Sequence, residues 1–119
     1  MLEKVNLDAA FATFDEHWSP RIAAEINEFA VKLVKVEGEF VWHHHDDEDE
    51  LFLVIDGELA IRLRDGEVRL GPGEMVMVPR GVEHQPVAAK ECRVLVFERT
   101  ATRNTGNLEN PRTVVPRRL

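Results

Sequence analysis

The sequence is short of cysteine and of long apolar runs, and each shortage argues against a class of protein. Its 119 residues include a single cysteine, Cys92, so no disulfide can form within the chain, and a reducing, cytoplasmic setting is expected. No apolar run approaches the ~18 residues that a membrane-crossing helix requires. The first residues lack a basic segment followed by an apolar one, so no secretory signal is expected.

Positive charge is also scarce. The chain has 15 Lys and Arg against 22 Asp and Glu, which gives a formal net charge of −7. Binding to nucleic acid or to an anionic membrane needs a concentration of basic side chains, so neither partner is expected. Small molecules and metal cations are the partners that this charge favours.

The chain has the usual size of one domain, and its first 20 residues show helical spacing. The apolar residues there recur every three or four positions, which places them on one stripe of a helix: Leu7, Ala10, Phe11, Phe14 and Trp18. Asn6 can cap the start of this helix, and Ser19-Pro20 is expected to end it. We therefore predict that residues 1–20 form a helix that packs on the edge of a sheet, with His17 at its exposed end.

Residues 21–99 have the pattern of an all-β protein. Residues 59–63 alternate between apolar and polar, Asp65-Gly66 is a hairpin turn, and residues 75–78 form a short strand. A strand end and turn are expected at residues 87–91, before a further strand at 92–98. About eight short strands result, as in a β-sandwich or barrel. Residues 100–119 differ in composition, and they could be disordered or could form an arm over this domain or over a partner subunit.

Several residues in this region are predicted to serve packing. Cys92 lies in a strand pattern, which is more typical of a core or surface residue than of a nucleophile. Met75 and Met77 are expected to fill the core.

The segment from His43 to Glu50 carries three of the five histidines and five acidic residues. In a strand His43 and His45 point to one face and His44 to the other, so the pair can reach one cation. Glu50 is the first residue of the next predicted strand and can supply a carboxylate ligand. Asp49 is the alternative carboxylate ligand if Glu50 does not reach the metal. His44 is expected on the outer face, and the acidic residues 46–49 are expected to form a solvent-exposed turn. Alone, the segment is also consistent with a solvated loop that binds nothing.

Two sets of residues resemble the motifs of the cupin superfamily. The first consists of Gly38, His43, His45, Glu50 and Gly57, with one residue fewer before the histidines than is common. The second consists of Gly73, Pro79, Gly81 and His84 at the family spacing, with Ala88 in place of a frequent asparagine. The resemblance implies a double-stranded β-helix, the cupin jelly-roll barrel, formed by residues 21–99. It also implies that His43, His45, Glu50 and His84 bind one divalent metal.

The sequence is compatible with several metals and with more than one reaction. Imidazole and carboxylate ligands suit Fe, Mn, Ni, Zn, Co and Cu alike. The resemblance implies dioxygenase or isomerase chemistry on a small organic molecule, and a non-catalytic module that binds or senses a metal or small ligand is the alternative. Glu39 and Glu98 are the candidate catalytic bases, because strand alternation points both inward. Arg62 is expected on the outer phase of its strand, which disfavours a phosphosugar substrate.

Apolar residues on the outer phase of the strands predict an interface between subunits. The set consists of Phe40, Trp42, Leu51 and Leu53. A homodimer is expected, because a barrel of this size often pairs and the C-terminal segment can be exchanged between copies.

Overall fold

A long central strand, β7 (Gln85–Arg99), organises the fold in the computed structural model, which describes residues 2–119. It pairs antiparallel with three other strands: β2 along most of its length, β4 at residues 85–87 and β3 at residues 93–97. The expected turn at residues 87–91 is therefore wrong. The chain bends there without leaving the strand, because successive parts of β7 find different partners.

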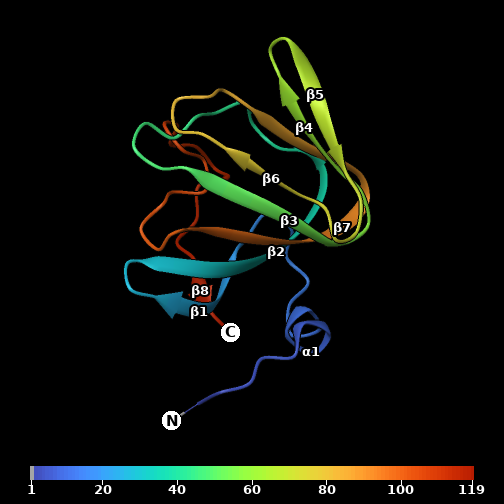
Figure 1. Ribbon diagram of the computed structural model, residues 1–119, viewed down its shortest axis with the longest axis vertical. Coiled ribbons are helices and arrows are strands. Elements are labelled where there is room, and N and C mark those ends of the chain that lie inside the picture. The colour runs from blue at the N-terminus through green and yellow to red at the C-terminus, as the bar shows by residue number, and fades with distance from the viewer. Residues whose placement is uncertain (1) are drawn as a thin grey trace.

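Together with β7, the other strands form a barrel, and one short helix lies below it in the view of Figure 1. In chain order they are α1 (Leu7–Phe11), β1 (Arg21–Ile26), β2 (Phe29–Glu39), β3 (Glu50–Asp56), β4 (Leu59–Leu63), β5 (Gly66–Leu70), β6 (Met75–Val78) and β8 (Arg117–Arg118). The sheet order is β5-β4-β7-β2-β1-β8, and β3 pairs with β6 and β7. The predicted all-β class is confirmed. The predicted hairpin is also present, but its two turn residues are Arg64 and Asp65, because Gly66 already pairs with Leu63.

The barrel is filled by side chains from alternate positions of its strands. Branched residues dominate this core, and they include Val34, Val54, Ile61 and Val94. Their burial supplies most of the stability of such a fold. Cys92 belongs to the same core and is buried, and this burial raises the pKa of its thiol to about 11. It is a packing residue, as its position in a strand pattern predicted.

Helix α1 is much shorter than the spacing of apolar residues predicted. Asn6 does cap it, with Oδ1 accepting from the amide of Ala9 at 2.9 Å. The helix ends at Phe11, however, and Trp18 lies in the left-handed region at φ 60°. The amide of Trp18 donates to the carbonyl of Lys35 at 2.8 Å, so pairing with the neighbouring strand replaces the later helical turns.

The short helix nevertheless covers part of the outer face of the barrel. Ala10, Phe11 and Phe14 pack with Leu33 of β2 in a second apolar cluster. Trp18 packs against the barrel core instead. His17 is exposed and pairs with Glu91 at 2.8 Å.

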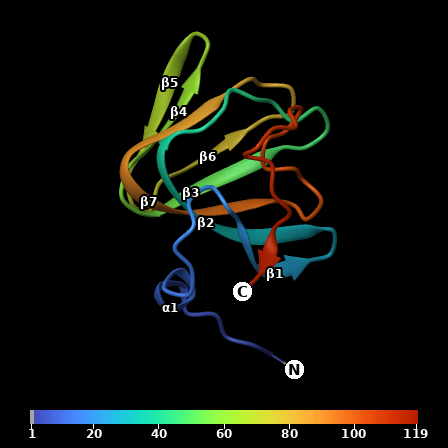
Figure 2. The ribbon, with the colours of Figure 1, turned by 180° about the vertical axis from the view of Figure 1, so that it is seen from behind.

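The C-terminal segment runs back along the barrel and ends beside β1 (Figure 2). There β8 pairs in parallel with β1 at Arg21 and Ile22. In this chain the segment therefore lies over its own barrel. Within residues 2–119, no helix has the length and apolar character needed to cross a membrane.

The two methionines of β6 are exposed, so their predicted role in the core is wrong. Met75 is 62% exposed and Met77 is 51% exposed. They lie opposite Leu53 and Leu51 of β3, whose side chains are half-buried. The inward positions of β6 belong to Val76 and Val78, which pack with the core.

Candidate metal centre

The two motif segments of the sequence meet at one end of the barrel. His43 and His84 form an isolated antiparallel bridge, in which each amide donates to the other's carbonyl at 3.0 and 2.9 Å. The amide of Gly81 donates to the carbonyl of His45 at 2.8 Å. Glu50 is the first residue of β3. Backbone pairing thus brings residues from distant parts of the sequence to one place.

Four buried side chains converge there, and they are His43, His45, Glu50 and His84. One potential ligand atom from each lies within 4.8 Å of the others. Oε1 of Glu50 is 3.2 Å from Nε2 of His45 and 3.4 Å from Nε2 of His84. Three imidazoles and one carboxylate at this separation form a ligand set for a divalent transition metal.

Backbone carbonyls fix the orientation of two of the imidazoles. Nδ1 of His43 donates to the carbonyl of Val41, and Nδ1 of His84 donates to that of Val82, both at 2.9 Å. Each ring therefore turns Nε2 away from this bond, as metal-binding histidines do when a second hydrogen bond sets their tautomer.

Several of the converging atoms have no partner within the protein. Both ring nitrogens of His45, Oε1 of Glu50 and Nε2 of His84 are buried without a hydrogen bond of good geometry. Buried polar atoms are rarely left in this state, because the loss of hydration is not offset. A bound cation would satisfy them, so the residues present fit a metal.

The protonation states also suit a cation. Burial, followed by the proximity of His84, lowers the pKa of His43 to about 4, so this imidazole is neutral at pH 7. Burial works to raise the pKa of Glu50, but the nearby polar groups of His45, His84 and Glu98 hold it well below its usual range. Neutral imidazoles and an ionised carboxylate are the forms that bind metals.

The family model described as "Cupin domain" matches residues 30–98, which include all four converging residues. The chain belongs to the cupin family. The double-stranded β-helix that the sequence motifs implied is therefore confirmed as its fold.

Relatives of this cupin domain are found among curated proteins and solved structures. It is 41% identical over 63 residues to the uncharacterized protein YdbB of Bacillus subtilis (strain 168), covering 52% of this chain and 56% of that one, so it spans only about half of that relative. A cupin-2 domain containing protein from Shewanella frigidimarina is 50% identical with a TM-score of 0.79, over 80% of this chain and 93% of the other. Protein NMB1881 from Neisseria meningitidis is 32% identical with a TM-score of 0.75, over 82% and 99%.

The two candidate bases lie in different surroundings. Glu98 is buried inside the cupin barrel, where Oε1 accepts from Nζ of Lys32 at 3.0 Å. Burial, and then the charge of Glu50, hold the pKa of Glu98 well above its usual range. Glu39, by contrast, is exposed and pairs with Arg62 at 2.8 Å. The expected inward position is wrong for Glu39 and right for Glu98.

The phase of β2 explains the position of Glu39. Val34 and Val36 of this strand pack in the barrel core, whereas Val31 and Leu33 pack in the outer cluster with α1. Glu39 continues the outward phase and is exposed, and Phe40, predicted on the outer face, is buried inside. The strand ends at Glu39, so its alternation does not extend through residues 40–42 to the histidines.

The other polar residues of the segment stay outside the cluster. His44 is half-buried and its Nε2 lies 2.9 Å from Asp46, in keeping with its expected outward direction. Asp49 accepts from the amide of Arg80 at 2.9 Å. That amide is the main cause that lowers the pKa of Asp49. Asp49 thus serves the turn, and Glu50 is the carboxylate at the cluster.

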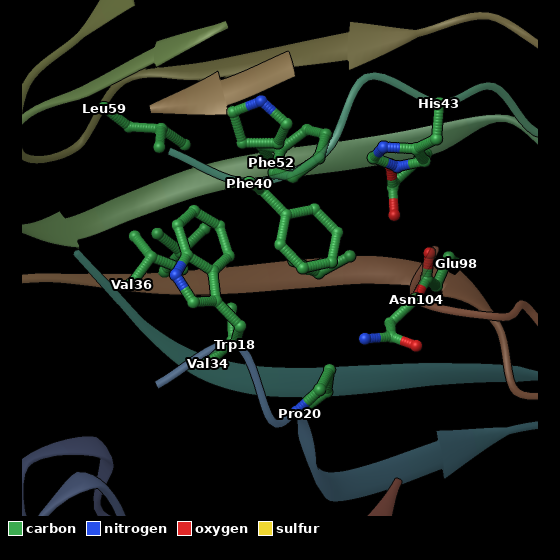
Figure 3. A pocket seen from close by; sticks show the side chains of 14 residues that line it. Trp18, Pro20, Val34, Val36, Phe40, His43, Phe52, Leu59, Glu98 and Asn104 are labelled. Atoms are coloured by element: carbon green, nitrogen blue, oxygen red, sulfur yellow. The ribbon is translucent and has the colours of Figure 1, made fainter. Parts of the chain in front are cut away.

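A hollow inside the cupin barrel extends from the cluster (Figure 3). His43, Glu98 and Asn104 lie toward one end of it, and Val36 and Leu59 lie toward the other. Trp18 and Phe40 stack at 4.7 Å between ring centres and line it together. The space open to the centre of a water molecule is about 50 Å³.

The C-terminal segment, residues 100–119, forms hydrogen bonds with the backbone of His44, next to the metal cluster. The amide of His44 donates to Oδ1 of Asn107, and the amide of Asn107 donates to the carbonyl of His44, both at 2.9 Å. Gly106 has a φ of 59°, and a Cβ there would lie 2.9 Å from Cδ2 of His43 and would collide with the carbonyl of His44. Sequence reasoning missed this contact, because no pattern in residues 100–119 indicates where the segment docks.

Lys32 was also missed as a member of the site, although a signal for it exists. It shares its phase on β2 with Ala30 and Val34, which face the barrel interior. A lysine in phase with apolar residues indicates a buried partner of opposite charge, since an unpaired buried ammonium is very unfavourable.

Proposed function

We propose that this cupin domain binds one divalent transition metal through His43, His45, Glu50 and His84 and acts on a small organic molecule. The observation that carries the proposal is the convergence of four buried potential ligand atoms within 4.8 Å, several of them without a partner in the protein. Fe, Mn, Ni, Zn, Co and Cu all accept such ligands, so the metal is left open.

The surroundings of the cluster support chemistry of the dioxygenase or isomerase type. Such a metal, when bound, would activate O2 or polarise a carbonyl oxygen. The chain contributes fixed imidazoles, a largely apolar hollow that limits water, and Glu98 as a nearby carboxyl group outside the ligand set. Arg62 bonds to Glu39 and Gln85 and does not line the hollow, which disfavours a phosphosugar isomerase.

One observation favours the alternative, a non-catalytic module that binds or senses a small ligand. Of the two candidate bases, Glu39 lies at the surface and Glu98 is held by Lys32. A ligand would then raise the melting temperature of the metal-loaded protein without being converted.

Elemental analysis of the protein as purified tests the metal proposal. About one transition metal per chain is expected, as four protein ligands would give. The variant His45→Ala should lose the metal and keep the fold by circular dichroism. The neighbouring His44→Ala is the matched control and should retain it. Equal metal content in both variants would contradict the assignment, and turnover assays on the loaded protein then separate enzyme from binding module.

We also propose that the chain forms a homodimer in the cytoplasm. The predicted interface needs revision, because Phe40 is buried inside and Trp42 is covered by Arg64 at 3.8 Å. Leu51 and Leu53 keep their outward direction, and exposed Met77 and Met75 extend them along β6. This outer face of β3 and β6 is the surface on which a second copy would pack.

A further inference from the structure

The hollow beside the metal cluster has walls made almost entirely of hydrocarbon. Of its 14 lining residues, ten are apolar: Trp18, Pro20, Val34, Val36, Phe40, Phe52, Leu59, Pro86, Val94 and Val96. The other four are His43, Glu50, Glu98 and Asn104. Two of these belong to the proposed ligand set, which leaves two polar side chains to face the body of a ligand.

Those two side chains are largely engaged by the protein. Nδ2 of Asn104 donates to the carbonyl of Arg112 at 2.7 Å, and its Oδ1 accepts from the amide of Val114 at 3.0 Å. Oε1 of Glu98 accepts from Lys32. Oε2 of Glu98, at the same end of the hollow as His43, has no partner within the protein. The walls therefore offer little hydrogen bonding beyond the metal cluster itself.

Within residues 2–119, no lysine or arginine lines the hollow. Lys32 is buried behind Glu98 and engaged by it. Arg112 lies beyond the lining, with its guanidinium 5.6 Å from the ring centre of Phe40 and 5.9 Å from that of Trp18. An anionic group at the end of the hollow away from the metal cluster would therefore meet hydrocarbon and no cationic side chain, so its loss of hydration would not be offset.

The space also limits the size of a ligand. The volume open to the centre of a water molecule is about 50 Å³. By the same measure, a cavity needs ~10–15 Å³ to hold one water molecule. A compact molecule of about one ring fits this space better than a sugar with a phosphate group.

We propose that the substrate or ligand of this site is a compact, uncharged and largely apolar molecule, with a single oxygen-bearing group that reaches the metal. This inference rests on the proposed metal function. It goes further by naming the ligand class: an aromatic or branched hydrocarbon body carrying a metal-binding hydroxyl or carbonyl, to the exclusion of phosphorylated and polyanionic molecules.

The test uses probes that share one metal-binding head. Acetohydroxamate and benzohydroxamate carry the same chelating group and differ in a methyl group against a phenyl ring. Calorimetric titration of the metal-loaded protein should show benzohydroxamate binding about tenfold or more tightly, because the apolar walls bury its ring. The para-carboxylated benzohydroxamate should lose about tenfold of that affinity, and a hexose phosphate should not compete.

A matched pair of variants on β2 locates the effect. Val36→Leu narrows the hollow, and Val31→Leu adds the same group on the outer face of the same strand. Val36→Leu should weaken benzohydroxamate by about tenfold and leave acetohydroxamate within about twofold, whereas Val31→Leu should change neither. If Val36→Leu does not fold, the ratio of the two probes on the unaltered protein still decides.

Equal affinity for the two hydroxamates, with metal bound, overturns the ligand class and leaves the metal function standing. Tighter binding of the carboxylated probe that disappears in Arg112→Gln overturns the uncharged class and indicates an anionic ligand. A protein that takes up no metal overturns the proposed function, and the inference with it.

Discussion

Lys32 and Glu98 face each other from adjacent strands inside the barrel, with Nζ 3.0 Å from Oε1 and neither side chain more than 3% exposed. Nζ also donates to the carbonyl of Thr102 at 3.3 Å. The pair therefore links the barrel interior to the start of the C-terminal segment. It lies next to Glu50, whose charge contributes to the raised pKa of Glu98.

Removing one member of this pair should be far more harmful than removing both. Lys32→Met leaves Glu98 buried without its cation, and we expect it to lower the free energy of unfolding by about 3–5 kcal/mol. The double change Lys32→Met with Glu98→Leu should stay within about 1 kcal/mol of the original, since apolar residues of similar size can replace a buried ion pair. Guanidinium unfolding of the metal-free protein measures both. A double variant as unstable as the single one would contradict this account.

The stability of the metal-free protein should fall as the pH is lowered from about 6.5 to about 4. In the folded state the pKa of His43 is depressed from 6.5 to about 4. The unfolded chain therefore takes up the proton first, and this uptake favours unfolding as the pH falls. The free energy of unfolding should fall by at most about 3.5 kcal/mol, from about 1.4 kcal/mol per pKa unit.

Urea unfolding at a series of pH values, with chelator present, measures this dependence. Because carboxyl groups also titrate near the lower limit, the readout is the difference from His43→Gln, whose unfolding should depend less on pH in this window. Parallel curves for the two proteins would show that His43 does not contribute.

Gly106→Ala should weaken both the fold and the metal site. The new Cβ would collide with the carbonyl of His44, and the backbone at φ 59° is unfavourable for alanine. We expect a loss of about 1–3 kcal/mol in stability and a metal affinity reduced about tenfold, because the contacts that hold His43 would shift.

Gly71→Ala is the control for this change. Its Cβ would meet only the side-chain carboxylate of Glu74 at 3.4 Å, an ordinary contact, and no positive φ is involved. Melting temperature and metal titration should be close to those of the original protein. If both glycine variants behave alike, the docking of residues 106–107 does not support the site.

Met77→Glu should convert the proposed dimer into a monomer. Met77 is 51% exposed and lies opposite Leu51, so a charge there would be buried by a second copy packed on this face. Val115→Glu places the same charge at an 86% exposed position on the C-terminal segment and should leave the dimer intact. Sedimentation velocity distinguishes the two, and a monomeric starting protein would contradict the dimer itself.

Much of the fold was predictable because local chemistry and tertiary structure agree there. The hairpin between β4 and β5, the alternation of residues 59–63 and the short strand at 75–78 are each specified within a few residues. That His43 and His45 share one face also follows from simple alternation, and the structure brings them together with Glu50 and His84.

The incorrect predictions involve distant partners. Helical spacing continues to Trp18, but the pairing of Trp18 with Lys35 ends the helical path earlier. Regular strand structure ends at Glu39 and alternation does not run unbroken through residues 40–42, so the direction of His43 and His45 does not give that of Glu39 and Phe40. Met75 and Met77 alternate correctly, yet only the barrel decides which of the two phases faces inward.

The hydrogen bonds between His44 and Asn107 join positions 63 residues apart in the chain. At roughly 5–20 residues per second, a ribosome reaches Asn107 about 3–13 s after His44. During that time, residues 43–45 of the nascent chain lack the hydrogen bonds that Asn107 later forms with His44. Cations in the cell would thus meet the imidazoles before these hydrogen bonds can form. Metal choice in such a chain can depend on when in its lifetime the ion is supplied.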